Sequence, residues 1–247
     1  MIEITEHGAV REIRLARPPV NALNLELIRR LDAAIADAAR DAVGAIVLTG
    51  RPGVFSAGLD VAAIATLDAG GLGELVSSFF ALQRRLAASP VPVVCAITGH
   101  CPAGGTVIAL YCDRRMMAAG AFGIGLNEVQ VGLFPGLRIF RVYARLIGEA
   151  RAADLLGRGA MVAPDEARAI GLVDEVLPAA QVLPRALAFA AELAALPPLA
   201  YRRTRTLVRQ PLVDLLDLPE QIDLQTWITA ETRACMARVL KPATSGG

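Results

Sequence analysis

The protein has 247 residues, of which 54% are hydrophobic and 20% are charged, and its formal net charge is +1. This length suits one large domain, or one domain with a small helical extension. A net charge so close to zero does not favour nucleic acid as the main partner. The sequence contains no run of about 18 strongly apolar residues, so we expect no membrane span.

The four cysteines, Cys95, Cys101, Cys112 and Cys235, have neither metal-ligand spacing nor the density of a disulfide scaffold. Three of them lie in apolar or turn positions, where a buried, inert thiol is typical. The N-terminal residues lack the basic and apolar regions of a signal peptide. These features favour a reduced, cytoplasmic protein without a metal site.

The first part of the chain predicts strands and one amphipathic helix. Residues 2–5 and 10–15 alternate in polarity and predict a two-stranded hairpin. Asn24 can cap a helix over about 25–40, which carries an apolar stripe. Residues 45–49 form a short apolar run that is typical of a buried strand.

A segment rich in Ala and Gly follows at residues 61–73 and predicts a mobile region before a helix over about 74–88. We expect Asp68 and Glu74 to be solvated surface acids.

The second half of the chain predicts mainly helices. Their expected ranges are 138–147, 149–156, 181–196 and about 220–240. Pro164 and Gly171 mark the start and end of a further short helix, which precedes a strand at 173–177. Pro197 and Pro198 mark the expected boundary between a core of residues 1–196 and a C-terminal helical region of residues 197–247.

A glycine-rich turn separates an apolar strand from a helix in the middle of the chain. Residues 93–98 read as the strand, Gly99–Gly105 as the turn and residues 106–112 as a buried helix. The free N–H groups and the dipole at a helix start favour negative charge, so this turn is a candidate oxyanion site. Alternatively, Gly104 and Gly105 serve only close packing of the helix against the strand.

A single acid, Glu128, follows within the mostly apolar segment 122–132. A carboxylate among apolar neighbours tends to have a raised pKa, which makes Glu128 a candidate base. A solvated loop glutamate is the alternative.

Five segments, taken together and in this order, resemble the crotonase, or enoyl-CoA hydratase/isomerase, superfamily. They are Pro18–Leu23, Val54–Asp60, Gly99–Gly105 with Cys112–Asp113, Gly125–Glu128 with Pro135–Gly136, and Ala163–Asp174. The resemblance covers roughly residues 1–195 and is closest to the Δ3,Δ2-enoyl-CoA isomerase branch. It implies an α/β crotonase (ClpP-like) fold, a spiral of repeated ββα units. It also implies a helical C-terminal region that mediates trimers or dimers of trimers.

The resemblance also assigns site residues. It makes the backbone N–H groups of Leu59 and Gly104 the two oxyanion donors and Glu128 the acid/base. The substrate-binding residues that it implies are Ala57, Asp60, Val61, Val107, Asn127 and Phe134. Of these, Ala57 and Asp60 would line the adenine end of coenzyme A, and Val107 and Phe134 would form pocket walls. Asn127 would also shape its loop through a hydrogen bond to Glu128 or to a loop carbonyl.

The implied reaction depends on how many acids the site holds. A hydratase of this superfamily usually has a second Glu where this chain has Val107, and some diene-shifting relatives have an acid where it has Gly136. One acid is sufficient for a 1,3-proton shift, so the expected activity is isomerisation of a 3-enoyl-CoA to the 2-enoyl-CoA. No cofactor is expected, because coenzyme A is part of the acyl thioester substrate. Hydration, thioester hydrolysis and a non-catalytic acyl-CoA- or RNA-binding role are the alternatives.

Two further features have alternative interpretations. The arginines at 202, 203, 205 and 209 suggest coenzyme A phosphates or nucleic acid as ligands, or simply a solvated basic helix face, which we favour. His100 lies beside the proposed donor turn, and we expect a structural role for it.

Overall fold

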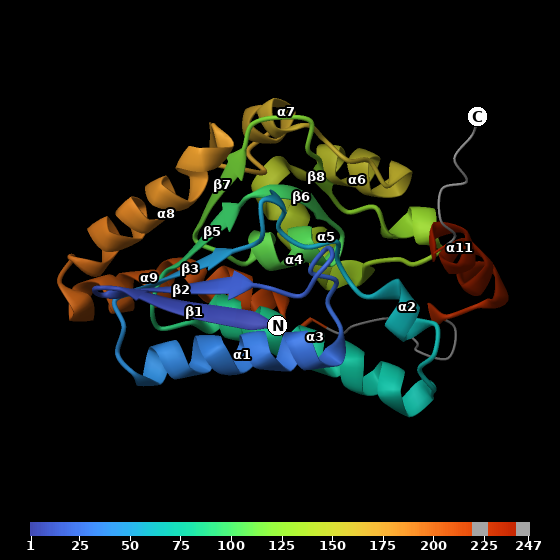
Figure 1. The fold of residues 1–247 in the computed structure, drawn as a ribbon, viewed down its shortest axis with the longest axis horizontal. Coiled ribbons are helices and arrows are strands. Elements are labelled where there is room, and N and C mark those ends of the chain that lie inside the picture. The colour runs from blue at the N-terminus through green and yellow to red at the C-terminus, as the bar shows by residue number, and fades with distance from the viewer. Residues whose placement is uncertain (219–226, 241–247) are drawn as a thin grey trace.

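Two sheets form the centre of the computed structural model, which describes residues 1–218 and 227–240 (Figure 1). The larger sheet has the order β1-β2-β3-β5-β7-β9, and its strands are Ile2–His7, Val10–Leu15, Ala45–Thr49, Val93–Ile97, Arg114–Ala118 and Glu175–Leu177. The smaller sheet has the order β4-β6-β8, with strands Gly53–Val54, Gly99–Pro102 and Ile124–Gly125. Strands β1 and β2 form the expected antiparallel hairpin, and the other described strand pairs are parallel.

The two sheets grow together along the chain. The consecutive strand pairs β3/β4, β5/β6 and β7/β8 each add one strand to the larger sheet and one to the smaller sheet. Helices α2 (Val61–Ile64) and α3 (Ala69–Ala88) follow the first pair, and α4 (Gly104–Leu110) follows the second. This arrangement confirms the expected spiral of strand–strand–helix units.

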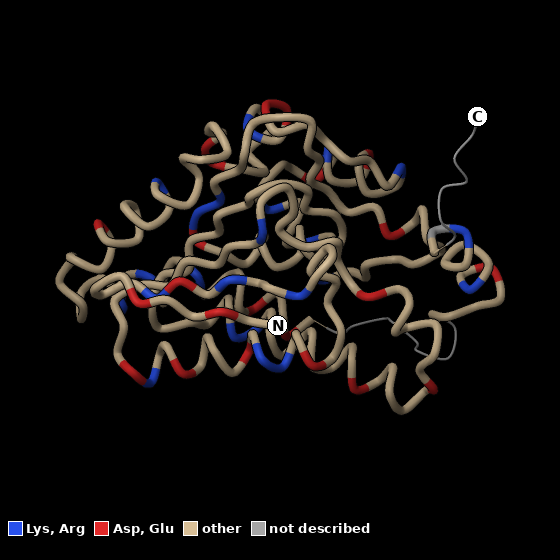
Figure 2. Tube along the Cα trace, in the orientation of Figure 1, with Lys and Arg blue, Asp and Glu red and all other residues tan. Residues whose placement is uncertain are grey.

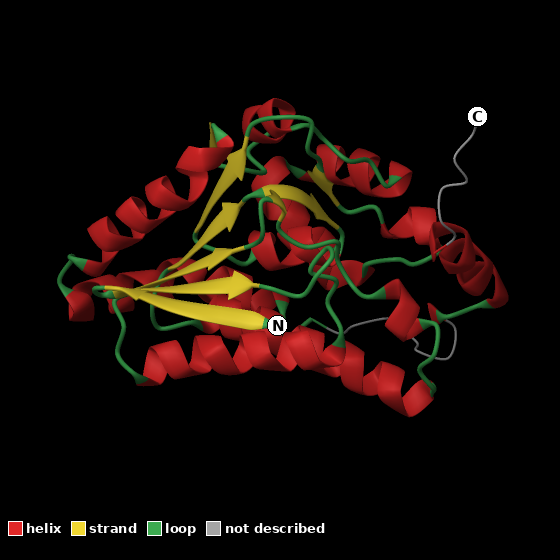
Figure 3. Cartoon of the chain, viewed as in Figure 1, coloured by secondary structure: helices red, strands yellow, loops and turns green. Residues whose placement is uncertain are grey.

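Helices cover both faces of the larger sheet (Figures 1 and 3). On one side, α1 (Leu25–Arg40) packs against α3, and on the other α8 (Ala179–Ala194) packs against β3, β5 and β7. The buried residues of α1 are the predicted stripe, and they face the core: Leu27, Ile28, Leu31, Ala34, Ile35 and Ala38. Asn24 caps this helix, as predicted, by accepting a hydrogen bond from the Leu27 N–H at 2.9 Å.

The remaining described helices are the 3₁₀ helix η1 (Glu128–Val131), α5 (Gly136–Ile147), α6 (Glu149–Arg158), α7 (Pro164–Ala169), α9 (Pro198–Leu215) and α11 (Ala230–Leu240). They pack against different parts of the molecule, with α9 against α3 and α5, α7 against β9, and α11 against η1 and α2. The last helix was expected over about 220–240, and residues 220–226 of that range lie outside the described residues. The chain bends by 109° between α8 and α9, at the expected domain boundary, which itself stays a prediction.

The helices also bear on the expectation about membranes. Within residues 1–218 and 227–240, no single helix has the length and apolar composition needed to cross a membrane. Helices α8 and α9 meet those two criteria only as a bent pair.

The predicted start of the helix at about residue 74 was wrong, and the expected mobility of the segment 61–73 stays a prediction. This segment contains α2 and the first turn of α3, which starts at Ala69 rather than at Glu74. Asp68 caps α3 by accepting a hydrogen bond from the Gly71 N–H at 2.8 Å, and Glu74 forms an ion pair with Arg29. A cap satisfies an otherwise free N–H, which fixes the helix start despite the glycines.

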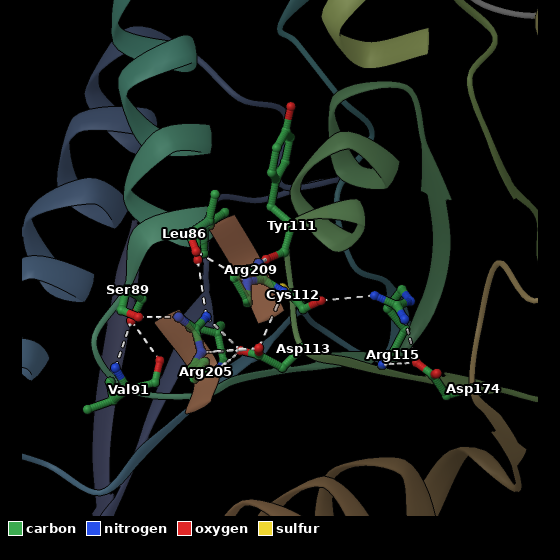
Figure 4. Close-up of polar contacts among 12 residues, drawn as sticks. Leu86, Ser89, Val91, Tyr111, Cys112, Asp113, Arg115, Asp174, Arg205 and Arg209 are labelled. Carbon is green, nitrogen blue, oxygen red and sulfur yellow. Dashed lines mark hydrogen bonds and ion pairs between the residues drawn. The ribbon is translucent and has the colours of Figure 1, made fainter. Parts of the chain in front are cut away.

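The prediction of a solvated basic face on α9 was wrong for two of its four arginines. The Arg205 and Arg209 side chains are 4% and 10% exposed, and both form ion pairs with Asp113 (Figure 4). Arg205 also donates to the carbonyl oxygens of Ser89 and Leu86 at the end of α3, and Arg209 donates to those of Ala87 and Tyr111. These two guanidinium groups hold α9 on the core and are not available to phosphates. Arg202 and Arg203 are exposed.

Charge is otherwise mixed over the molecule. Figure 2 shows basic and acidic segments interspersed along the helices and the edge hairpin. Some of these charges form surface ion pairs within one helix, such as Arg158–Asp154 and Arg30–Glu26. Such pairs contribute little to stability.

Candidate active site

Two backbone N–H groups meet where the loop after β4 reaches the start of α4. Leu23 forms a parallel bridge with Leu59, in which the Leu23 N–H donates to the Gly58 oxygen and the Asp60 N–H donates to the Leu23 oxygen. This pattern turns the N–H of Leu59 itself away from Leu23. A Cβ placed on Gly104 would lie 3.2 Å from the Leu59 nitrogen, so the two backbones are close. Neither N–H donates to an acceptor within the described part of the chain.

The segment 17–23 fixes the loop that carries Leu59. Asn21 is fully buried, and its amide donates to the Phe55 oxygen at 3.0 Å while its Oδ1 accepts from the Arg17 N–H at 2.8 Å. The Ser56 hydroxyl donates to the Asn21 oxygen at 2.8 Å and accepts from the Gly58 N–H at 3.1 Å. Buried polar groups that are fully hydrogen-bonded hold one backbone geometry. The sequence analysis identified the segments Pro18–Leu23 and Val54–Asp60 but not the roles of Asn21 and Ser56 within them.

The turn into α4 is shaped by close backbone contacts. Ala103, just before the helix, has φ +47°, a conformation that costs energy for a residue with a Cβ. Its N–H donates to the Gly125 oxygen at 2.8 Å. A Cβ on Gly105 would lie 2.8 Å from the Ser56 oxygen, so Gly105 serves close packing. The two interpretations of the glycine pair, close packing and an oxyanion site, therefore apply to different residues. Gly105 serves close packing, and Gly104 lies beside Leu59, where the oxyanion site is proposed.

Glu128 starts η1, shortly after β8. Burial raises its pKa from 4.5 to about 7, and a backbone hydrogen bond opposes this shift. Its Oε2 atom is buried and has no hydrogen-bond partner in the described structure. The predicted hydrogen bond of the Asn127 side chain is not found within residues 1–218 and 227–240, where Asn127 lines the cavity instead. Glu128 is therefore a desolvated carboxyl with one oxygen free to receive a proton.

A cavity of about 150 Å³ joins these groups. Eight of the nine predicted site residues line it: Ala57, Leu59, Val61, Gly104, Val107, Asn127, Glu128 and Phe134. Asp60 does not, because its carboxylate pairs with Arg17 at 2.7 Å and caps α2 through the Ala63 N–H at 3.0 Å. Glu128 is the single ionisable side chain among the described lining residues.

Three aromatic side chains of the cavity were missed by the sequence reasoning. Phe79 and Phe80 come from α3, and Trp227 comes from the segment before α11. Nothing in the local sequence pattern separates a pocket aromatic from a core aromatic. His100 lies outside the lining, where its Nδ1 accepts from the Gly123 N–H at 3.3 Å. No group of three or more metal-ligating side chains is found among residues 1–218 and 227–240.

The sequence matches the family described as enoyl-CoA hydratase/isomerase over residues 5–236. The chain belongs to the enoyl-CoA hydratase/isomerase family. It is similar to human mitochondrial enoyl-CoA delta isomerase 1, with 32% identity over 93% of this chain and 77% of that protein. It is also 36% identical to a probable enoyl-CoA hydratase of Mycobacterium leprae, over 72% of this chain and 69% of that protein.

Solved structures of this family share the fold. The human mitochondrial Δ3,Δ2-enoyl-CoA isomerase superposes with a TM-score of 0.82 at 31% identity, over 97% of this chain and 92% of that one. An enoyl-CoA hydratase/isomerase family protein from Pseudomonas syringae gives a TM-score of 0.84 at 29% identity, over 92% and 97%. These likenesses confirm the crotonase fold. Relatives named isomerase and relatives named hydratase both match, and one fold can host several reactions, so the site residues decide the reaction.

Proposed function

We propose that this protein is a Δ3,Δ2-enoyl-CoA isomerase in which one glutamate carries the proton. The observation that supports this most directly is the cavity lining, where Glu128 is the single ionisable side chain among the described residues. A 1,3-proton shift needs one group that removes a proton and returns it. Val107 occupies the position where a second acid would serve hydration, and it is 1% exposed.

The chemistry begins at the thioester carbonyl. Its oxygen would accept hydrogen bonds from the N–H groups of Leu59 and Gly104, which stabilise the enolate by about 3–4 kcal/mol each. Glu128 removes the proton from C2 of a 3-enoyl-CoA, and the electron pair of the C–H bond moves into the enolate. The extended enolate then takes the proton from Glu128 at C4, and the double bond ends between C2 and C3.

The pKa of Glu128 suits both half-reactions. A carboxyl with a pKa of about 7 is partly ionised at neutral pH, so it can both accept and donate a proton with little free-energy cost. An ordinary glutamate would be a weaker base towards the C2 proton. The apolar cavity both raises this pKa and strengthens the backbone hydrogen bonds to the enolate.

Hydration is the second candidate, supported by the M. leprae relative named as a probable enoyl-CoA hydratase. It requires a water molecule held opposite Glu128, and the neighbouring wall residue, Val107, has no polar group to hold it. Thioester hydrolysis has the same requirement.

The ligand and assembly form part of the proposal. The substrate is an acyl-CoA thioester, and the reaction needs no separate cofactor or metal. Self-association is supported by α9, whose exposed side chains include Leu199, Leu207 and Val208. We propose a trimer or a dimer of trimers. The four free cysteines suit a reducing compartment, which favours the cytoplasm.

Product analysis tests the reaction. The purified protein is incubated with trans-3-hexenoyl-CoA, and the products are separated by chromatography. Conjugated 2-hexenoyl-CoA as the main initial product supports the proposal. Accumulation of 3-hydroxyhexanoyl-CoA from 2-hexenoyl-CoA at an equal or higher rate, or release of free coenzyme A, would replace it with hydration or hydrolysis.

A further inference from the structure

The C-terminal segment contributes one side chain to the catalytic cavity. Trp227 stands three residues before α11 and lines the cavity, with 5% of its surface exposed. Its indole N–H donates to the backbone oxygen of Phe134 at 3.1 Å, across 93 residues of sequence. The indole is therefore held at a fixed place by a residue of the same cavity wall.

Helix α11 holds this segment against both sides of the site. The Thr232 hydroxyl donates to the Gly132 oxygen at 2.9 Å, just after η1. The backbones approach so closely that a Cβ on Gly132 would lie 2.9 Å from the Thr232 Cα. On the other side, the Arg233 guanidinium contacts the Ala65 oxygen at the end of α2 at 3.4 Å. Glycine at 132, with φ +72°, permits this docking.

Helix α11, which follows Trp227, lies away from the oxyanion donors. Figure 1 shows α11 at the edge of the molecule beside α2, whereas α4, whose start carries the Gly104 donor, lies near the centre. In the proposed function the thioester carbonyl binds beside the start of α4, because both N–H donors are there. Phe79, Phe80 and Trp227 line the same cavity, so an acyl chain bound there would pack against them.

The size of the cavity sets the length of chain that fits. An apolar cavity of about 150 Å³ in another protein takes up a molecule the size of benzene, which has six carbons. The cavity here has about the same volume and is lined mainly by apolar side chains. A longer chain would need the Trp227 indole to move, which breaks its hydrogen bond to Phe134 and the packing of α11.

We propose that Trp227 closes one end of the acyl cavity and restricts the enzyme to acyl chains of about six carbons. This inference rests on the proposed function for its substrate class. It adds a specificity-determining residue that lies far from Glu128 in sequence.

Chain-length profiles test the proposal. kcat/KM is measured for 3-enoyl-CoAs of 6, 8, 10 and 12 carbons with the wild type, Trp227→Ala and Trp227→Leu. The wild type is expected to be most active at six carbons and to lose activity steeply by ten. Both variants should raise the ratio of ten-carbon to six-carbon kcat/KM by tenfold or more. Trp227→Phe, which keeps an aromatic wall, should keep the wild-type profile. Equal profiles in all four proteins, or a wild type that prefers twelve carbons, would overturn the proposal.

A binding measurement separates this inference from the reaction itself. Calorimetry with saturated acyl-CoAs of 4 to 12 carbons requires no turnover. In the wild type, affinity should rise about fourfold per methylene up to about six carbons and then fall, because a longer chain must displace Trp227. In Trp227→Ala and Trp227→Leu the rise should continue to longer chains. If no enoyl-CoA is isomerised but this affinity pattern holds, the proposed reaction is wrong and the proposed role of Trp227 is retained. A steady rise in affinity to twelve carbons in the wild type would contradict the role of Trp227.

Discussion

The Thr106 hydroxyl links the start of α4 to Gly125. Its Oγ1 accepts a hydrogen bond from the Gly125 N–H at 3.0 Å and lies 3.0 Å from the Gly125 oxygen and close to the Cys101 oxygen. Thr106 is fully buried two residues after Gly104, and Gly125 lies three residues before Glu128. One side chain therefore fixes the distance between the oxyanion donor and the base.

Replacing Thr106 tests this link. Thr106→Val keeps the shape but removes the hydroxyl that contacts the Gly125 N–H and the Gly125 and Cys101 oxygens, so we expect a loss of about 1–3 kcal/mol in the free energy of unfolding. We also expect kcat to fall, because Glu128 is no longer held in register with Gly104. Urea unfolding and steady-state kinetics measure the two effects. Thr106→Ser is the matched control and should retain most of the wild-type stability and kcat. A valine variant with wild-type stability and kcat would show that the link is dispensable.

Gly104 is the second position where a single methyl group is informative. In Gly104→Ala the new Cβ would lie 3.1 Å from Leu23 Cδ1 and 3.2 Å from the Leu59 nitrogen, beside the proposed carbonyl site. We expect kcat to fall by about 10²–10³, the cost of losing one oxyanion donor. Gly157→Ala in α6, where a Cβ meets nothing within 4 Å, should leave kcat unchanged. Full activity of Gly104→Ala would remove Gly104 from the oxyanion site.

The buried cluster around Asp113 predicts a large difference between two arginines of α9. Arg205→Ala removes a 4% exposed guanidinium from its ion pair and leaves Asp113 and the Ser89 carbonyl with fewer partners, so it should cost about 3–5 kcal/mol of stability. Arg203→Ala, on the exposed face, should change the free energy of unfolding by less than about 0.5 kcal/mol. Urea unfolding midpoints measure the stability of the two variants. Equal losses of stability in Arg205→Ala and Arg203→Ala would contradict the role of the cluster.

The raised pKa of Glu128 makes stability depend on pH. Between pH 4.5 and about 7 the unfolded chain loses this proton while the folded chain keeps it, so stability falls as pH rises through this window. The glutamine in Glu128→Gln cannot ionise, so the variant does not lose stability in this pH window. We expect the variant to be more stable than the wild type by up to about 3 kcal/mol above pH 7, and the difference to vanish below pH 4.5. Urea unfolding at several pH values checks this; a difference independent of pH would contradict the shifted pKa.

Local signals in the sequence predicted much of the fold. The α1 stripe follows from its helical periodicity, the Asn24 cap from the residue type before the helix, and strands β3 and β5 from short apolar runs. Strand β7 was missed because it begins with two arginines. Arg115 is nonetheless buried, because Asp174 accepts its N–H at 2.7 Å and pairs with its guanidinium at 2.9 Å. A contact across 59 residues cannot be read from a local pattern.

The distinction between local patterns and long-range contacts also applies to the site. The backbone donors and Glu128 lie in short motifs whose glycines and lone acid are visible in the sequence. Trp227 and Phe79 reach the cavity only through the packing of α3 and the C-terminal segment, which no motif records. Arg205 was assigned to a solvated face because its partner, Asp113, lies 92 residues away. Long-range partners decide which side chains are buried, and the sequence does not show them.

In the proposed mechanism Glu128 alone moves the proton. The direct test compares kcat for trans-3-hexenoyl-CoA in the wild type and in Glu128→Gln, followed by the absorbance of the conjugated thioester, with acyl-CoA affinity measured in parallel. We predict that the variant binds acyl-CoA as the wild type does and loses turnover by about 10²–10⁴ or more, as expected for a lost acid/base. Turnover by the variant within a few fold of the wild type would contradict the account.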